Sequence, residues 1–161
     1  MRLLAVPSAL TLILAAACAS TAGSGEASRA GFQRTVGTAS ALDATEKALK
    51  VLSLFQFEIR RQDQVPSIVI ETEWRRRDPF ADELELGILA AENRVFVTGR
   101  RRAETELGPI FNVSLAVENR VRLNAAGSPW VETSATPMYR QFADSIFKLY
   151  QRELTIGVRR H

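Results

Sequence analysis

The feature that most constrains the fold is a regular alternation of apolar and polar residues late in the chain. Over residues 111–123, every second side chain is apolar except Asn119, and the positions between them carry Asn, Ser, Ala, Glu and Arg. This pattern predicts a strand of an antiparallel sheet with one face against a core and the other toward water. Alternating stretches at residues 55–59, 68–74 and 94–102 predict three more strands.

The segments between these strands give mixed signals. Residues 61–66 indicate one turn and residues 108–109 another, because both stretches contain the residues that turns favour. Residues 80–91 are compatible with a surface loop, a short helix or an insertion with a small strand. In residues 94–102 the phase of the strand stays open, because two valines favour one face and Phe96 the other.

Two amphipathic helices flank the strands. Ser40 followed by Asp43 is a weak capping box, and apolar residues then recur at helical spacing through Leu52. Thr136-Pro137 predicts the start of the second helix, with threonine as N-cap and proline at the first helical position. We expect this helix to end near residue 153 and to be followed by a short strand over residues 154–158.

The order of helix, strands and helix predicts an α+β fold. We expect a two-layer sandwich, with an antiparallel sheet of three to five strands and two amphipathic helices on one face. A single domain over residues 38–161 is expected, since about 125 residues bury roughly two-thirds of the surface of the unfolded chain. An apolar fraction of 46% and a charged fraction of 24% argue against a disordered chain and a polytopic membrane protein.

The beginning of the chain predicts export. Met1-Arg2 precedes an almost wholly apolar stretch over residues 3–17, which is shorter than the roughly 20 residues of a transmembrane helix. The stretch resembles a bacterial lipoprotein signal, in which Cys18 is lipidated and becomes the new N-terminus; Ala15 stands where that motif usually has leucine. We expect a signal peptide over residues 1–17 and a flexible tether over residues 18–37. An ordinary cleaved signal is the alternative.

The same resemblance implies a location. Cys18 is followed by Ala19-Ser20 and not by the aspartate that, in enterobacteria, retains such proteins on the inner membrane. It therefore implies a protein that is anchored to the outer membrane by acylated (palmitate-bearing) Cys18 and faces the periplasm. Nucleic acid is not expected as a partner at that location.

Few residues offer catalytic chemistry. The single cysteine is assigned to the anchor and the single histidine is the last residue, which argues against histidine-based zinc sites and against Ser-His or Cys-His triads. The acidic candidates are Glu71, Glu73, Asp82, Glu83 and Glu85. On a wet sheet face, alternating glutamate and arginine favours cross-strand ion pairs, and the loop lacks the glycine of a calcium-binding loop. We expect no enzyme activity, no metal and no cofactor.

The basic residues are the main candidates for binding. Of the 21 lysines and arginines only three are lysine, and the arginines cluster on predicted strands. The candidates are Arg75, Arg76, Arg77, Arg100, Arg101, Arg102, Arg120 and Arg122. Aligned on neighbouring strands, they predict a positive surface for lipid head groups, lipopolysaccharide phosphates or an acidic protein face. The alternative is a solvated face that Glu71, Glu73 and Glu118 balance, since the net charge is only +3.

A family resemblance adds a possible role. The segment from Phe57-Glu58-Ile59 through Val69-Ile70-Glu71-Thr72-Glu73-Trp74 resembles the start of the repeated domains in BamC-type (NlpB) lipoproteins of the outer-membrane β-barrel assembly machinery. The order of elements extends this resemblance over residues 38–158, although that family has two such domains. It implies a binding or scaffold module with an envelope protein as partner. A similarity in architecture to LptE-type lipopolysaccharide-assembly proteins implies instead that basic strands bind glycolipid phosphates.

Overall fold

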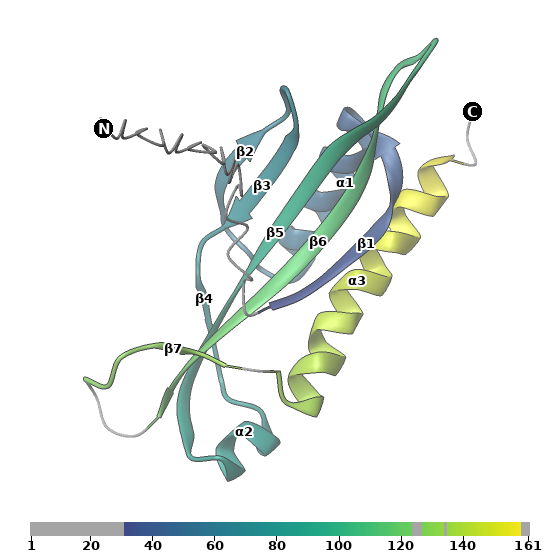
Figure 1. Ribbon diagram of the computed structural model, residues 1–161. Coiled ribbons are helices and arrows are strands. Elements are labelled where there is room, and N and C mark those ends of the chain that lie inside the picture. Colours follow the sequence, from purple (N-terminus) through teal and green to yellow (C-terminus); the bar gives the residue numbers. More distant parts are fainter. Residues whose placement is uncertain (1–30, 124–126, 134, 159–161) are drawn as a thin grey trace, which may run out of the picture.

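The computed structural model describes residues 31–123, 127–133 and 135–158 (Figure 1). The elements follow in the order β1 (Gly31–Ser40), α1 (Ala41–Leu54), β2 (Ile59–Asp63), β3 (Ile68–Thr72), β4 (Arg75–Arg77), α2 (Ala81–Glu85), β5 (Ile88–Thr105), β6 (Gly108–Leu123), β7 (Val131–Glu132) and α3 (Pro137–Val158). In this part of the chain, no helix is long and apolar enough to cross a membrane.

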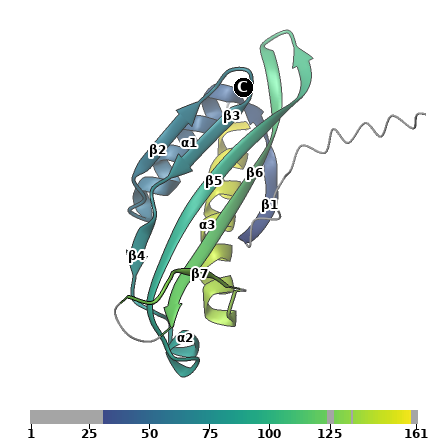
Figure 2. The ribbon, with the colours of Figure 1, turned by 60° about the vertical axis from the view of Figure 1, so that its left-hand side comes forward.

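The long β5–β6 hairpin is the centre of the sheet. The strand order is β1-β6-β5-β3-β2, with β4 beside β5 and β7 beside β6, so the described strands form one seven-stranded sheet. All the pairs are antiparallel. β3 pairs with β5 near Val97 and β4 pairs with it near Glu92, so the two short strands follow one another along the same edge of β5. The turn of the hairpin projects beyond the neighbouring strands (Figures 1 and 2).

Helices α1 and α3 cover one face of this sheet, and the core lies between the two layers (Figure 2). The Tyr150 hydroxyl donates to the Ala44 carbonyl oxygen at 2.8 Å, which joins the two helices inside the core. The short helix α2 lies at the opposite end from the hairpin turn, where Asp82 Oδ2 accepts from the Met138 N–H at the start of α3. The α+β class with an antiparallel sheet is confirmed; the expectation of three to five strands and two helices is wrong.

The predicted starts of both long helices are confirmed. Ser40 Oγ accepts from the Asp43 N–H at 3.1 Å, and Thr136 Oγ1 accepts from the Tyr139 N–H at 3.3 Å. The strand expected over residues 154–158 is wrong, because α3 continues to Val158. Leu154 is buried one turn after Tyr150, so the apolar stripe of the helix extends past the predicted end.

The predicted start of the domain is wrong. Residues 31–37, expected in the tether over residues 18–37, belong to β1, so the sheet begins by Gly31 and not at residue 38. β1 buries little beyond Val36 and Ala39, and it is held by backbone pairing with β6, from Gly31 opposite Glu118 to Ser40 opposite Ile110. Backbone pairing leaves no signal in hydropathy. The predicted signal peptide and Cys18 lie outside the described residues.

The stretch after α1 also differs from the prediction. Phe55 and Phe57 alternate with polar residues, but they close the helix: the Phe57 N–H donates to the Leu52 carbonyl oxygen at 2.9 Å, across Gln56 with a φ of 57°. The strand of this region is β2, which begins at Ile59, the last residue of the predicted strand, and continues through residues 61–63, which were expected to form the turn. Residues 80–91 contain a short helix, which was one of the three possibilities, and the beginning of β5.

Candidate functional site

The eight candidate arginines do not form one continuous surface. Arg76 of β4 is opposite Glu92 of β5, and Arg122 of β6 is opposite Ala90, so the arginines of β4 and β6 gather at the α2 end of the sheet. Arg100 lies eight residues beyond Glu92 along β5, which is about 26 Å at the rise of a strand. The structure therefore places the arginines of β4 and β6 at one end of the sheet, on both of its faces, and separates residues 100–102 from them.

Arg77 is part of the interior. Its two Nη atoms bind the two carboxylate oxygens of Glu83 at 2.6 Å each, and Nη2 also donates to Asn119 Oδ1 at 2.9 Å. Only 6% of the Arg77 side chain and none of the Glu83 side chain is exposed. This ion pair fastens α2 to the sheet, so Arg77 belongs to the fold and not to the predicted binding surface.

Arg75 is half-buried on the same side as the helices. Its guanidinium lies 4.9 Å from the ring centre of Phe57 and 5.9 Å from that of Phe142. Burial, and secondly the positive charge of Arg77, lowers the pKa of Arg75. The aromatic contacts direct this arginine into the layer between sheet and helices, away from the face that carries Arg120 and Arg122.

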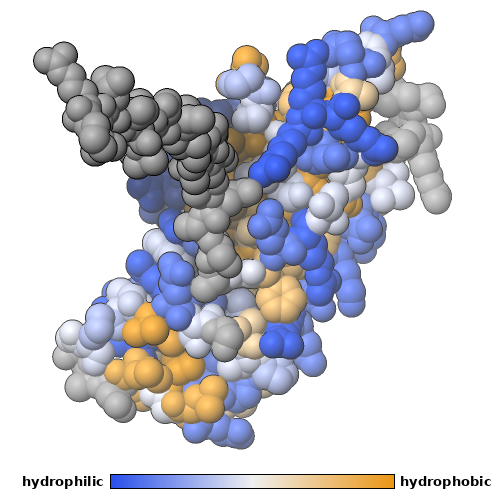
Figure 3. All heavy atoms as spheres, in the orientation of Figure 1, coloured by the Kyte–Doolittle hydropathy of each residue, from blue (hydrophilic) through white to orange (hydrophobic). Residues whose placement is uncertain are grey.

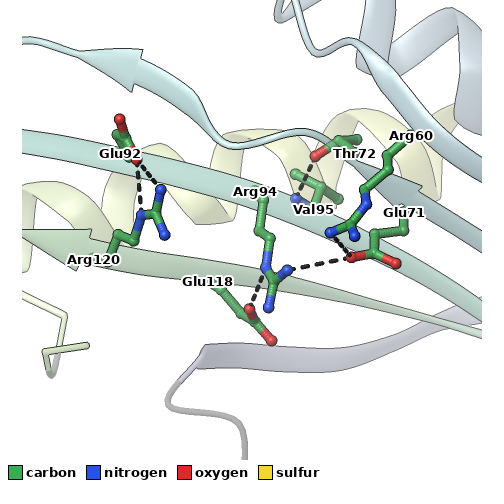
Figure 4. A network of polar contacts seen from close by, with 8 residues as sticks. All are labelled: Arg60, Glu71, Thr72, Glu92, Arg94, Val95, Glu118 and Arg120. Atoms are coloured by element: carbon green, nitrogen blue, oxygen red, sulfur yellow. Dashed lines mark hydrogen bonds and ion pairs between the residues drawn. The ribbon is translucent and has the colours of Figure 1, made fainter. Parts of the chain in front are cut away.

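On the face away from the helices, arginines and glutamates alternate across the strands (Figure 4). Arg94 Nε binds Glu118 at 2.7 Å and its Nη1 binds Glu71 at 3.2 Å. Arg120 Nε binds Glu92 at 2.8 Å. Both Glu92 and Glu118 are buried, although this face was expected to be wet. The alternative interpretation of the arginines, a sheet face balanced by glutamates, describes this part of the molecule.

Two tryptophan side chains pack against the arginines of this face. Trp74 lies between Arg94 and Arg120, with guanidinium carbons 4.5 and 4.1 Å from its ring centre. Trp130 lies against Arg120 at 5.0 Å and against Arg122 at 4.5 Å. Stacking of this kind holds each guanidinium plane in a fixed position.

A cleft of about 440 Å³ opens at the α2 end of this face. Residues of β4, the segment after it, the start of β5, the end of β6 and the segment before β7 bound it; they include Arg76, Asp78, Pro79, Leu89, Arg122 and Trp130. We refer to this site as the basic cleft. Arg76 has 85% of its side chain exposed, and its Nε is 3.3 Å from Glu92. Asp78 is the one acidic residue in the lining.

Arg122 differs from the other arginines of this face. Its neighbour on β5 is Ala90, whereas Arg120 is opposite Glu92 and Arg94 is opposite Glu118. Within the described part of the chain, the Arg122 Nε is buried and has no hydrogen-bond partner. A positive group fixed by stacking and without a carboxylate can accept an anion from outside.

Exposed apolar side chains lie at the same end of the sheet as the basic cleft, and one of them, Leu89, lines it. They come from α2, β5, β6 and β7 and are Leu84, Leu86, Leu89, Leu123 and Val131, all exposed. Figure 3 shows apolar residues gathered at the lower left of the molecule, where these elements meet. We call these five residues the apolar patch. Exposed apolar groups beside a cleft indicate a binding surface.

The arginines of the hairpin have a different setting. Arg101 forms an exposed ion pair with Glu104. Leu107, at the turn, is 94% exposed. Together they belong to a projecting arm.

Sequence reasoning identified Arg76 and Arg122 but missed Trp130 and Leu89. Trp130 follows a loop, and Leu89 falls in the stretch whose structure was left open; the tryptophan beside a turn was the only available signal. Among the described residues, no three His, Cys, Asp or Glu side chains are grouped so that they could hold a metal ion. Cys18 and His161 lie outside these residues. The sequence matches no protein-family model, and no curated protein matches it significantly.

Proposed function

We propose that this chain is a non-enzymatic lipoprotein of the bacterial envelope, anchored to the outer membrane by acylated Cys18 and facing the periplasm. Its α+β domain acts as a binding or scaffold module. The signal-like stretch before Cys18 and the small residues around it support the anchor. The proposal assigns the anchor to the first 18 residues and the binding to the folded domain.

One observation carries the binding role: Arg122 is held by Trp130 in an open cleft, and its buried Nε has no partner in the described residues. A buried donor without a partner costs stability, and a bound acceptor offsets that cost. The other arginines of this face, Arg76, Arg94 and Arg120, each have a glutamate as partner. The basic cleft is therefore the place where a ligand or partner gains most.

The first partner that we propose is another envelope protein, in outer-membrane protein assembly. Arginine and tryptophan dominate the energetic centres of protein interfaces, and the apolar patch beside the basic cleft enlarges the surface to be covered. The second is an anionic lipid or lipopolysaccharide. The joint presence of Arg76, Arg122 and exposed leucines favours it, because a lipid offers both an anion and an apolar chain.

Two measurements test the proposal. The intact mass of the protein purified from membranes is expected to correspond to a chain that begins at acylated Cys18. A photo-cross-linking residue in place of Leu89, at the basic cleft, is expected to capture a partner in cells, whereas the same residue in place of Leu107, at the hairpin turn, serves as the control. Capture at both positions to the same extent, or a mature chain without Cys18, would contradict the proposal.

A further inference from the structure

We infer that the basic cleft binds a single amphiphilic molecule, with a phosphate or carboxylate head group at Arg122 and Arg76 and an apolar chain that begins at Leu89. This inference rests on the second of the two partners proposed above and names the ligand and its orientation. The sequence predicted a binding surface along the whole basic face of the sheet, whereas this inference restricts the binding site to one end of that face.

The head-group site follows from the register of the strands. Arg122 is the arginine of β6 whose β5 neighbour is alanine, so the position that a carboxylate occupies beside Arg94 and Arg120 is open beside Arg122. Stacking on Trp130 holds its guanidinium at 4.5 Å from the ring centre. An oxyanion at this point is attracted by the positive charge of the Arg122 guanidinium, which lines the cleft and whose buried Nε has no partner among the described residues.

Arg76 supplies a second positive charge. It projects from β4 into solvent on the other side of the basic cleft and contacts Glu92 through a 3.3 Å interaction of Nε. Glu92 is also bound by Arg120, at 2.5 and 2.8 Å, so it keeps a partner when Arg76 turns toward a ligand. Asp78 opposes an anion in the lining, and this places the head group nearer to Arg122.

The chain site begins where the head-group site ends. Exposed Leu89 lines the basic cleft together with Arg122. Pro79 and the ring of Trp130 add apolar surface to the same lining. A ligand bound through its anion at Arg122 thus meets apolar side chains with its first chain carbons. A free phosphate would leave the apolar part of this lining uncovered.

The volume suits one small head group and the start of one chain. About 440 Å³ lies within the usual range of about 300 to 1,000 Å³ for small-molecule sites. Ala90, opposite Arg122 on β5, contributes a small side chain to the lining. A bilayer surface is flat and does not need such a hollow, so a single molecule fits better than a membrane face.

The test uses the mature chain, held in an amphipathic polymer, with Trp74→Phe so that Trp130 is its only tryptophan. The probe is dihexanoyl phosphatidylglycerol, kept monomeric. We expect it to change the Trp130 fluorescence saturably. The zwitterionic dihexanoyl phosphatidylcholine and inorganic phosphate are expected to bind at least about tenfold more weakly, since the first lacks net charge and the second lacks the chain.

Variants locate the site. Arg122→Gln is expected to weaken the binding of phosphatidylglycerol by roughly tenfold, and Leu89→Asp is expected to weaken it as well. Arg102→Gln, an exposed arginine of the hairpin arm, is the matched control and is expected to leave binding unchanged. Thermal unfolding of each variant checks that the fold is kept; Leu89 is 62% exposed, so its replacement does not disturb the core.

The outcomes separate this inference from the proposed function. Equal binding of the choline lipid, equal binding of phosphate, or unchanged binding by Arg122→Gln overturns the inference. Capture of a protein at position 89 without lipid binding overturns it too, and leaves the protein-partner function in place. A chain purified from membranes without an acyl group contradicts the anchor. If that chain still binds phosphatidylglycerol saturably, the binding site is supported.

Discussion

The buried ion pair between Arg77 and Glu83 allows a quantitative prediction about stability. Glu83→Gln keeps the shape of the side chain but removes its charge, so Arg77 keeps a positive charge that is almost completely buried. Breaking one partner of a buried pair costs about 3 to 5 kcal/mol. The bidentate geometry at 2.6 Å and the added contact with Asn119 place this pair in that class.

Guanidinium denaturation followed by circular dichroism measures the loss in the free energy of unfolding. Thermal unfolding gives a second measurement: at about 3 °C per kcal/mol for a domain of this size, its midpoint is expected to fall by roughly 10 °C. The double variant Arg77→Met/Glu83→Leu removes both charges, so it is expected to lose less stability than Glu83→Gln alone. This ordering distinguishes an unpaired buried charge from a general loss of packing.

The matched control is Glu104→Gln. Glu104 forms an ion pair with Arg101 that is exposed on both sides, and an exposed pair contributes less than about 1 kcal/mol. If Glu83→Gln costs no more than Glu104→Gln, water reaches Arg77 and the reasoning is refuted. If the double variant is the least stable of the three, the packing around the pair matters more than its charge.

Three further predictions concern the fold. Gly99→Ala places a Cβ 2.7 Å from Cδ1 of Ile68, so it is expected to cost about 1 to 3 kcal/mol in denaturation experiments; a neutral change would mean that the sheet shifts freely there. Ser40→Ala removes the N-cap of α1 and is expected to cost about 1 kcal/mol, measured in the same way, and an unchanged midpoint would argue against the cap. Burial raises the pKa of both Tyr139 and Tyr150; the stability they contribute is therefore present below the unfolded-state pKa of about 10 and declines as the pH rises above it. Absorbance of tyrosinate is expected to appear only together with unfolding, and titration of either tyrosine in the folded chain would contradict this.

The sequence predicts the parts of the fold whose residues face a core. The starts of α1 and α3 depend on local hydrogen bonds by Ser40 and Thr136, and both are visible in the sequence as capping residues. The strands β3 and β6 alternate regularly because one face of each packs against the helices. β1 has no such alternation, since its place is fixed by backbone pairing with β6.

The candidate site was harder to predict because arginine serves several purposes in one chain. Arg77 and Arg76 are one residue apart, yet the first is buried with Glu83 and the second is in solvent. The difference arises from the alternation of faces along β4 and from the position of α2, a five-residue helix that was only one of three possibilities for its stretch. No composition rule separates these two roles.

The register of β5 and β6 explains why the site lies at one end of the sheet. Going along β6, Glu118 and Arg120 each have an oppositely charged neighbour on β5, and Arg122 has Ala90. The cross-strand pairing of opposite charges therefore ends at Arg120, and Arg122 has no charged neighbour on β5. Whatever binds at Arg122 takes the place of the missing carboxylate.

This argument leads to a last prediction. Ala90→Glu supplies a carboxylate opposite Arg122, in the relation that Glu92 has to Arg120, so it is expected to leave stability unchanged or to raise it by about 0.2 to 1 kcal/mol. The same change occupies the floor of the basic cleft and neutralises its fixed charge, so anion binding is expected to disappear. Fluorescence titration and denaturation of the one variant measure both effects. A variant that is stable and still binds the anion would show that Arg122 is not the group that holds it.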